Sequence, residues 1–386
     1  MKQTYRALNG LRFVAASAIV AYHYGPTTTG FSMIPTFCQN LVLTGPIALG
    51  FFYILSGFVL THAYSDRVPQ TPVSRRSFWF ARVARLYPVY LLAFVLFAPM
   101  AYVKYIQHPA NGISGIRTFL LGGTLNLVAL QAWTPLAQAW NGPSWSLSVE
   151  AFFYLIFPFV LPRILGLRLS RLLPILVGLW MAMMGVTVAH SCGIISDSLW
   201  RDWVENSPLF WTPLFLIGIA LWRFSDRWSS VRPSVASLAT IASLSILLLL
   251  SGLVPSNIRE VLISGGAAPL LASVVLTFSH PKSFGSRFLG SNVLFEAGAV
   301  SYITYILQAP VWHILRLAMS RTRSATSGDA TADWQLGVYL ALLLALSFVV
   351  QWTVERPAQR LLLADNRLRR NLNDQARLAN SNMEAA

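Results

Sequence analysis

An arginine and a histidine share one face of an apolar segment near the N-terminus. Arg12 and His23 lie eleven residues apart in LNGLRFVAASAIVAYHYG, residues 8–25. Eleven residues make about three helical turns, so on a helix both side chains project from one face, about 16 Å apart along the axis. An arginine in hydrocarbon costs roughly 3 kcal/mol or more and normally faces a polar cavity. The pair predicts a polar channel with a titratable imidazole inside a membrane bundle. The structural alternative is an arginine and a histidine at the two membrane surfaces.

Composition places this segment in an integral membrane protein. Of the 386 residues, 55% are hydrophobic and 11% are charged, and the mean hydropathy is +0.55. Soluble domains carry about 25% charged residues. We interpret residues 8–25 as a transmembrane helix and not as a cleavable signal, because Arg12 interrupts the apolar run.

Apolar stretches long enough to cross a bilayer recur along the chain. They predict an all-α bundle of ten transmembrane helices with both termini cytoplasmic, at 8–25, 41–63, 86–104, 147–165, 172–191, 207–222, 234–253, 260–279, 292–315 and 334–354. The net charge is +15, and most Lys and Arg residues fall on the inner side of this topology, as the positive-inside rule predicts. The basic balance therefore reports topology and not nucleic-acid binding. Residues 1–362 are predicted to form the membrane domain and 363–386 a polar cytoplasmic tail.

The apolar segment 118–133 does not fit this alternation. As an eleventh span it would place the basic residues 163–171 outside. A re-entrant or interfacial hairpin in the outer loop 105–146 is the preferred interpretation. Such a hairpin requires protein or a wet cavity to satisfy its backbone.

A carboxylate is predicted to reach the depth of His23. Glu150 follows Trp145 and Ser146 at the outer start of the fourth span. A carboxylate beside a histidine orients the ring and makes it a better base. In the alternative interpretation, Ser146 and Glu150 cap the start of their helix.

Four arginines precede the third span, on a predicted inner loop. They are Arg75, Arg76, Arg82 and Arg85, and the last two are three residues apart, on one helical face. Guanidinium groups match phosphate oxygens well, so this face is predicted to hold a phosphorylated cytoplasmic ligand. Ordinary contact with anionic lipid is the alternative.

Small residues and cysteines leave two further questions open. Ser56 and Gly57 in the second span allow either close helix packing or the approach of a thin substrate chain. Cys38 and Cys192 both fall outside, where a disulfide and two free thiols are both possible. No His/Cys/Asp cluster has metal-ligand spacing. The sequence also has no phosphate-binding glycine loop and no nucleophile elbow.

Six short motifs occur in a characteristic order. They are Arg12 with His23, the LSGF run at 55–58, Arg82 with Arg85-Leu86-Tyr87-Pro88, Trp145-Ser146-Leu147 with Glu150, Phe153 and Tyr154, Gly298 with Ser301-Tyr302 and Tyr305, and Glu355 with Pro357. This order resembles that of the membrane acyltransferase family 3, bacterial proteins that acylate glycans. The resemblance extends from about residue 5 to residue 362.

The resemblance implies an enzyme of the bacterial inner membrane. Such an enzyme moves an acetyl or other short acyl group from cytoplasmic acyl-CoA to a sugar hydroxyl of a lipid-linked or exported glycan. Acyl-CoA is then a substrate, and no tightly bound cofactor or metal is expected. The implied catalytic residues are His23, Glu150 and Arg12; the implied donor-binding residues are Arg82, Arg85, Arg75, Arg76, Ser56 and Gly57; the implied acceptor-binding residues are Trp145, Ser146, Tyr154, Ser301, Tyr302 and Gln308.

One position departs from the family pattern. Relatives often have a histidine where this chain has Gln308. A glutamine hydrogen-bonds but does not titrate near neutral pH, so His23 is the expected base or acyl carrier. A non-enzymatic transporter or flippase, and an acyltransferase for a lipid or small molecule, are the alternative functions.

Overall fold

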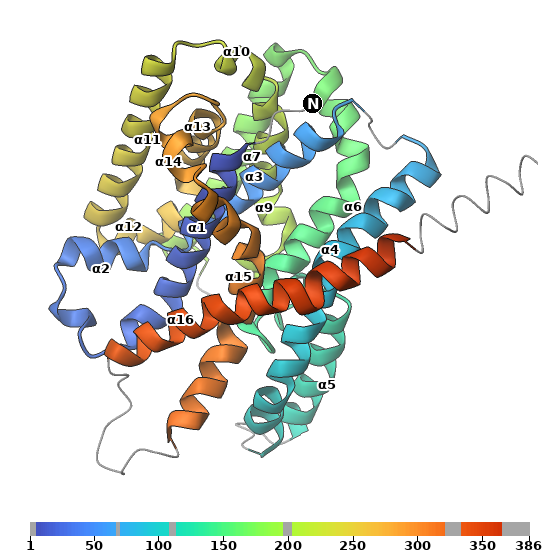
Figure 1. Cartoon of the computed structure of the whole chain (residues 1–386), viewed down its shortest axis with the longest axis vertical. Coiled ribbons are helices and arrows are strands. Elements are labelled where there is room, and N and C mark those ends of the chain that lie inside the picture. Colours follow the sequence, from blue (N-terminus) through green and yellow to red (C-terminus); the bar gives the residue numbers. More distant parts are fainter. Residues whose placement is uncertain (1–4, 67–69, 108–112, 196–202, 321–332, 365–386) are drawn as a thin grey trace, which may run out of the picture.

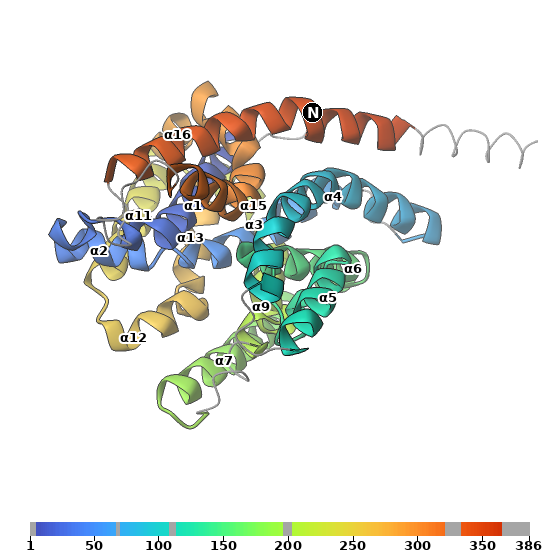
Figure 2. The same ribbon diagram turned by 90° about the horizontal axis from the view of Figure 1, so that it is seen from below.

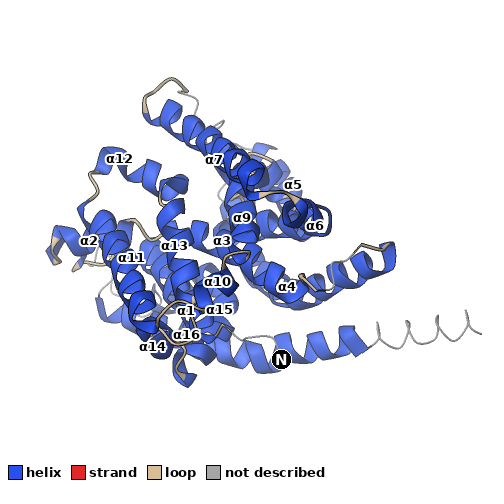
Figure 3. Cartoon of the chain, turned by 90° about the horizontal axis from the view of Figure 1, so that it is seen from above, coloured by secondary structure: helices blue, strands red, loops and turns tan. Residues whose placement is uncertain are grey.

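The computed structural model describes residues 5–66, 70–107, 113–195, 203–320 and 333–364. These residues form helices joined by loops, with no β-strand (Figure 3). The α-helices are α1 (Arg6–Tyr24), α2 (Thr36–Leu43), α3 (Ile47–Tyr64), α4 (Pro72–Tyr102), α5 (Ile113–Leu127), α6 (Trp145–Gly166), α7 (Leu169–Ser191), α9 (Pro208–Trp222), α10 (Ser225–Ser229), α11 (Pro233–Leu253), α12 (Ser256–Val261), α13 (Ala268–Phe278), α14 (Phe284–Leu289), α15 (Asn292–Ser320) and α16 (Asp333–Val350).

Seven described helical segments are long and apolar enough to cross a membrane. They contain α3, α4, α6, α7, α9, α11 and α16. The bent pair α12–α13 adds an eighth if it counts as one broken span; its bend of 46° falls at a π-helical turn where Gly265 has a φ of 113°. The predicted all-α membrane bundle is confirmed. The total of ten spans and the cytoplasmic termini stay predictions.

Two predicted spans, 8–25 and 292–315, form helices that are not among those seven. These are α1 and α15, which pack against each other along the bundle (Figure 1). A Cβ on Gly298 would collide with the carbonyl oxygen of Asn9 in α1, and the Asn9 amide donates to the carbonyl oxygen of Phe295 at 2.7 Å. Because protein surrounds the polar faces of both helices, they need less apolar surface than helices that face lipid.

A second close helix contact explains Gly57. A Cβ on Gly57 of α3 would collide with the carbonyl oxygen of Phe215 in α9, and a Cβ on Gly218 would collide with that of Ile54. These glycines therefore allow the backbones of α3 and α9 to touch, as small residues do in membrane bundles. This contact supports the packing interpretation of Gly57, whereas its predicted contact with the donor stays a prediction.

The arginines before the third span lie on a helix and not on a loop. Helix α4 begins at Pro72, because Thr71 caps it: the Thr71 hydroxyl accepts from the backbone N–H of Ser74, and the Ser74 side chain accepts from that of Thr71. The prediction of a loop is therefore wrong, whereas the position of these arginines on the inner side stays a prediction. Arg75, Arg76, Arg82 and Arg85 share the first four turns of α4, which fixes their relative positions.

The segment after α4 turns back along it. Helix α5 has 15 residues, fewer than the about 20 needed to cross a bilayer. It lies beside the far end of α4 (Figure 1), and the chain reverses at Ala129, whose φ is 55°. This arrangement supports a re-entrant hairpin over an eleventh span.

Side chains from α4 and α6 satisfy the backbone at the hairpin tip. The Tyr90 hydroxyl donates to the carbonyl oxygen of Asn126 at 2.5 Å, and the Tyr87 hydroxyl donates to that of Leu127 at 3.0 Å. Ser148 donates to the carbonyl oxygen of Ala129 at 2.6 Å. A non-helical tip at membrane depth needs such partners, because lipid supplies none.

The structure describes the chain's last helix but only the first two residues of the predicted tail. Helix α16 lies along one side of the bundle next to α15 and continues past it (Figure 2). The predicted tail, 363–386, lies outside the described residues from 365 onward. Cys38 and Cys192 are both free and exposed, so the structure contains no bridge between them.

Candidate active site

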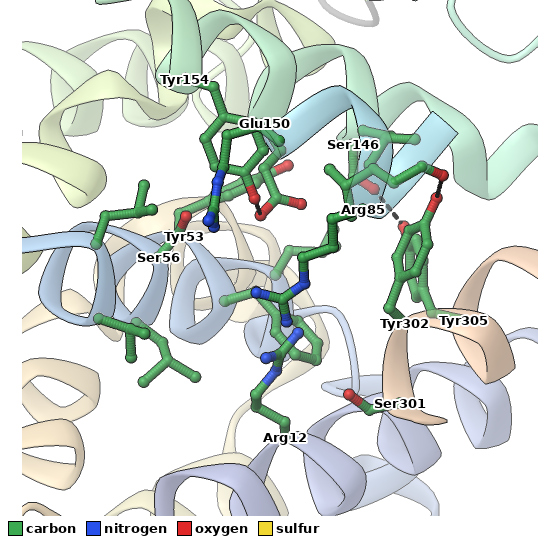
Figure 4. Close-up of a pocket in the computed structure, with 18 of the residues that line it drawn as sticks. Arg12, Tyr53, Ser56, Arg85, Ser146, Glu150, Tyr154, Ser301, Tyr302 and Tyr305 are labelled. Atoms are coloured by element: carbon green, nitrogen blue, oxygen red, sulfur yellow. Dashed lines mark hydrogen bonds between the residues drawn. The ribbon is translucent and has the colours of Figure 1, made fainter. Parts of the chain in front are cut away.

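A cavity of about 110 Å³ opens between α1, α3, α4, α6, α15 and the end of the α16 segment (Figure 4). Five charged side chains line it: Arg12, Arg82, Arg85, Glu150 and Glu355. Hydroxyl groups line it as well, from Tyr53, Ser56, Ser146, Tyr154, Ser301, Tyr302 and Tyr305. The remaining wall is mostly aliphatic. A charged, hydroxyl-rich cavity inside a membrane bundle is expected to be functional.

The cavity holds more guanidinium groups than carboxylates. Arg12 from α1 and Arg85 from α4 point toward one another across it (Figure 4). The Nε atoms of Arg12 and Arg82 are buried and have no hydrogen-bond partner. Buried donors without partners are costly, and like charges that face each other repel. An anionic ligand would supply both the missing acceptors and the compensating charge.

The carboxylate of Glu150 is held from its own helix. The Tyr154 hydroxyl, one turn further along α6, donates to Glu150 Oε1. One hydrogen bond of 2.8 Å joins the hydroxyls of Ser146 and Tyr305. The Tyr302 hydroxyl donates to the carbonyl oxygen of Leu86 at 2.9 Å. These bonds join α6, α15 and α4 around one side of the cavity.

Sequence reasoning did not assign Tyr53, Tyr305 or Glu355 to the site. The Tyr53 hydroxyl is buried without a hydrogen-bond partner, and the side chain is 3% exposed. The signal for Tyr53 was a single hydroxyl within an otherwise apolar, aromatic run. Tyr305 and Glu355 belong to two of the six motifs of the sequence, but a tyrosine and a glutamate in separate helices gave no reason to expect them at one cavity.

Glu355 enters the cavity through a local change of helix type. Helix α16 continues as a π-helical turn, Gln351–Glu355, and such turns are frequent at functional sites. The Glu355 carboxylate accepts from the Gln359 amide at 3.2 Å, whereas the Arg356 guanidinium lies 3.8 Å above the ring of Trp352. Glu355 is therefore a wall of the cavity and not only an interfacial partner of Arg356.

His23 lies at the other end of α1 and does not line this cavity. Its side chain is exposed, and its Nδ1 is 3.0 Å from Oε1 of Gln308, which is fully buried. The predicted pairing of His23 with Glu150 is not formed, because Glu150 bonds Tyr154 and His23 bonds Gln308. The prediction that Glu150 lies at the depth of His23 is wrong, because Glu150 lines the cavity at the Arg12 end of α1.

The surroundings of Gln308 fix the tautomer of His23. The Gln308 Nε2 donates to the carbonyl oxygen of Tyr305 at 2.8 Å, which leaves Oε1 to face the imidazole. A carbonyl oxygen only accepts, so Nδ1 must carry the proton. The Nε2 lone pair of His23 is then available for a proton or an acyl group.

Four of the other predicted site residues lie outside the cavity wall. Arg75 packs 4.6 Å from the ring of Phe159, and Trp145 packs against Trp211 with ring centroids 6.4 Å apart. Arg76 is exposed near the start of α4. Gly57 faces α9. The cavity does bring together Arg12, Arg82, Arg85, Ser56, Ser146, Glu150, Tyr154, Ser301 and Tyr302. Within the described part of the chain, no group of three or more His, Cys, Asp or Glu side chains could hold a metal ion.

Comparison with known proteins identifies the family. The sequence model described as "Acyltransferase domain" matches residues 5–356, so the chain belongs to the membrane acyltransferase family 3. The chain therefore carries an acyltransferase domain within a bundle of helices that are long and apolar enough to cross a membrane.

Named relatives agree with this class. The chain is 30% identical over 226 residues to an acyltransferase, MdmB, of Streptomyces mycarofaciens, which covers 56% of this chain and 52% of the relative. It is 25% identical over 335 residues to the peptidoglycan O-acetyltransferase OatA of Listeria monocytogenes, covering 79% and 49% respectively. The chain thus spans about half the length of these two relatives. No solved structure gave a significant match.

Proposed function

We propose that this acyltransferase moves an acetyl or other short acyl group from acyl-CoA to a sugar hydroxyl of a lipid-linked or exported glycan. One observation carries the proposal: three arginines meet in one cavity, and two of them have buried nitrogens without partners. CoA is the common acyl donor whose phosphates match such a cluster. The proposed setting is the bacterial inner membrane, with the start of α4 at the cytoplasmic face.

The donor's phosphates bind Arg82 and Arg85 in this proposal. Arg12 lies opposite Arg85 and contributes the third positive charge. Arginine forks bind phosphate oxygens through parallel hydrogen bonds. Ser56 and the unpartnered Tyr53 hydroxyl, both on the α3 wall, then face the pantetheine arm. No metal or resident cofactor is required.

Helix α1 sets the direction from donor to reaction centre. Arg12 and His23 are eleven residues apart, or about 16 Å along the helix. An extended pantetheine arm is of this order of length. The donor would therefore hold its phosphates at one end of α1 and present its thioester toward the other, while the exposed His23 is open to an acceptor.

The proposed chemistry needs one base. The His23 Nε2 takes the proton of the sugar hydroxyl as the oxygen attacks the thioester carbonyl carbon. The C–S bond breaks, and the imidazolium returns its proton to the CoA thiolate. In a two-step version, Nε2 itself attacks the thioester carbonyl carbon and the C–S bond breaks, which releases the CoA thiolate; the sugar hydroxyl then displaces the imidazole from the acyl group, and its proton passes to the thiolate. Gln308 positions His23 in either version through its contact with Nδ1.

The sugar hydroxyl is proposed to react at His23, whereas the aromatic and hydroxyl groups of α6 and α15 line the arginine cavity at the other end of α1 and are proposed to contact the donor. Tyr154 and Tyr302 line the cavity, with Ser146 and Ser301 beside them, and Trp145 is partly exposed next to it. Glu150 accepts a hydrogen bond from Tyr154 at this wall and so orients the Tyr154 ring. A glycan acceptor also agrees with the peptidoglycan activity named for the Listeria relative.

The experiment is a transfer assay with the purified protein in lipid vesicles. In the vesicles, labelled acetyl-CoA is supplied on one side and the transfer of label is measured. In a parallel experiment, ester groups on surface glycan are compared between cells with and without the gene. Acetyl-CoA binding with transfer supports the proposal. No acetyl-CoA binding by folded protein would contradict it. Succinyl transfer without acetyl transfer would change the donor, and transfer only to lipid or to a small molecule would change the acceptor.

A further inference from the structure

Three basic side chains come together where α4 and α15 end. They are Lys104, in the π-helical turn Val103–Gln107 that continues α4, and His313 and Arg316 of α15. All three are exposed, and among the described residues Lys104 and Arg316 are the charged groups whose fields reach the His313 ring. We call these three residues the α4–α15 basic cluster. Nothing in the proposed reaction uses them.

The cluster lies at the His23 end of the bundle. Gln308, which contacts His23, precedes the cluster on α15. His313 and Arg316 follow Gln308 by five and eight residues, or about 7.5 Å and 12 Å along the axis. The ends of α4 and α15 both lie at the lower end of the bundle in Figure 1. An anion held by the cluster would therefore place a short glycan attached to it within reach of His23.

The membrane topology does not explain this cluster. Most basic residues lie on the inner side in the predicted topology, whereas α4 and α15 both end on the outer side. The Lys104 ammonium lies 4.8 Å from the centre of the Tyr105 ring, and within the described part of the chain no carboxylate pairs with any member of the cluster. Like charges that converge without a counter-ion repel each other. An anionic ligand would supply the missing charge.

The cluster borders an exposed apolar surface. Val103, next to Lys104, is 41% exposed, and Ile314 and Leu317 of α15 are 44% and 51% exposed. Lys104 also lies near the end of the segment Val73–Gln107, which is long and apolar enough to cross a membrane. Positive charges beside apolar side chains at the end of such a segment match an amphiphile with an anionic head and a hydrocarbon tail.

We propose that the α4–α15 basic cluster binds the phosphate of a lipid-linked acceptor, whose tail lies in the bilayer and whose sugar turns toward His23. This inference rests on the proposed function, because it takes His23 as the reaction centre. The donor's phosphates stay on Arg82 and Arg85. Lys104 follows Arg85 by nineteen residues, or about 28 Å along the helix, so the two substrates do not compete for the same cations.

A phosphate fits this position better than the carboxylate of an acidic sugar. The phosphate of a lipid-linked sugar is attached directly to the hydrocarbon tail, so it is held at the membrane surface, beside the apolar side chains that border the cluster. A carboxylate on a sugar has no such fixed distance from the tail. The guanidinium fork of Arg316 also matches phosphate oxygens.

The test uses photo-crosslinking to the full chain in phosphatidylcholine vesicles. The probe is decyl diphosphate with a diazirine on its chain, and labelled peptides are located by mass spectrometry. Wild type is expected to be labelled within 97–107 and 309–319. Lys104→Gln combined with Arg316→Gln should reduce this labelling about tenfold, as expected for the loss of charge-assisted hydrogen bonds. Labelling that is insensitive to this double variant would overturn the proposal.

Two controls separate the cluster from general effects of charge and of lipid. Arg171→Gln with Arg287→Gln removes two exposed positive charges from α7 and α14 and should be labelled like wild type. A decyl glucoside with the same diazirine carries no charge and should label these peptides much less than the diphosphate. Equal labelling by the neutral probe would show an apolar contact only and overturn the proposal. Excess phosphatidylglycerol should not compete, and equal competition by it would show general binding of anionic lipid and also overturn it.

Two further measurements connect the cluster to the reaction. In cells, ester groups on surface glycan should fall about tenfold in the Lys104→Gln, Arg316→Gln variant at equal protein amount; normal ester levels would overturn the acceptor role. Acetyl-CoA binding is expected to be equal in this variant and wild type. If wild type fails to bind acetyl-CoA, the proposed function fails, whatever the crosslinks show. If acetyl-CoA binds and the cluster is not labelled, only this inference fails.

Discussion

The polar side chains at the two ends of helix α1 have different surroundings in the membrane bundle. At one end, Arg12 faces an open cavity, opposite another arginine, with a buried nitrogen that has no partner. At the other end, His23 is held by Gln308, whose own amide and carbonyl groups bond Tyr305 and Tyr339. The first end is incomplete without a ligand. The second end is already organised, with one ring nitrogen fixed and the other available.

This difference indicates a division of labour along one helix. The incomplete end is suited to binding an anion, and the organised end is suited to chemistry, since a preoriented base costs no reorganisation when the reaction occurs. Substitutions at the two ends should therefore separate binding from turnover.

The largest effect is expected at the organised end. His23→Ala should lower transfer by about 10²–10⁴-fold, because it removes the only base in the proposed reaction. Acetyl-CoA binding should change little. Both are measured with the purified protein in vesicles, alongside its amount and monodispersity. Near-normal turnover in a folded His23→Ala protein would remove His23 from the chemistry.

A strong effect on binding is expected at the incomplete end. Arg85→Ala should weaken acetyl-CoA binding by about 10–100-fold, since a hydrogen bond to a charged group contributes roughly 1.5–3 kcal/mol. Arg171→Ala removes an exposed arginine at the start of α7 and is the matched control. Equilibrium binding of labelled acetyl-CoA measures both. Equal acetyl-CoA affinity in the two variants would show that Arg85 does not bind the donor and only adds to the positive charge that sets the topology.

A smaller effect on turnover is expected from the residue that orients the base. Gln308→Met keeps the shape of the side chain but removes the acceptor for Nδ1. It should lower kcat about tenfold, corresponding to ~1.4 kcal/mol, with donor affinity unchanged. A purely structural role for Gln308 would instead lower protein yield and melting temperature while kcat per folded molecule stays the same.

The smallest effect is expected from Tyr53→Phe. The Tyr53 hydroxyl is buried without a partner, so its loss should not destabilise the protein. If it contacts the pantetheine arm, donor affinity should fall about three- to tenfold, as for one neutral hydrogen bond. Thermal unfolding and acetyl-CoA binding are the two measurements. Unchanged affinity would mean that the donor passes on the other side of the cavity.

Local pattern was enough to predict the helices and most of the cavity. The apolar runs predicted the bundle, and the structure brings together in one cavity the arginine pair of α4, Glu150 and Ser56, which the sequence had predicted as site residues. The cavity confirms their proximity, whereas their roles stay predictions. The re-entrant interpretation of the hairpin also agrees with the short α5.

Contacts between distant elements were not predictable from the same patterns. The sequence placed Glu150 at the depth of His23, but Glu150 lines the cavity at the Arg12 end of α1, and the packing of α1 on α15 brings Gln308 to His23 instead. Gly57 could equally face a ligand or a helix until the backbone of α9 was seen beside it. Glu355 lies at the end of a π-helical turn that brings it to the cavity. No residue type in the sequence predicts such a turn.

The glycine contacts between α1 and α15 have a mechanical consequence. A transporter alternates access by rocking one group of helices against another around its binding site. Here the backbones of α1 and α15 touch at Gly298 and Asn9, and both ends of the proposed reaction path lie on these helices. We expect this contact to resist movement of α1 against α15. In the proposed reaction, the acyl group would then pass between two ends whose separation is fixed.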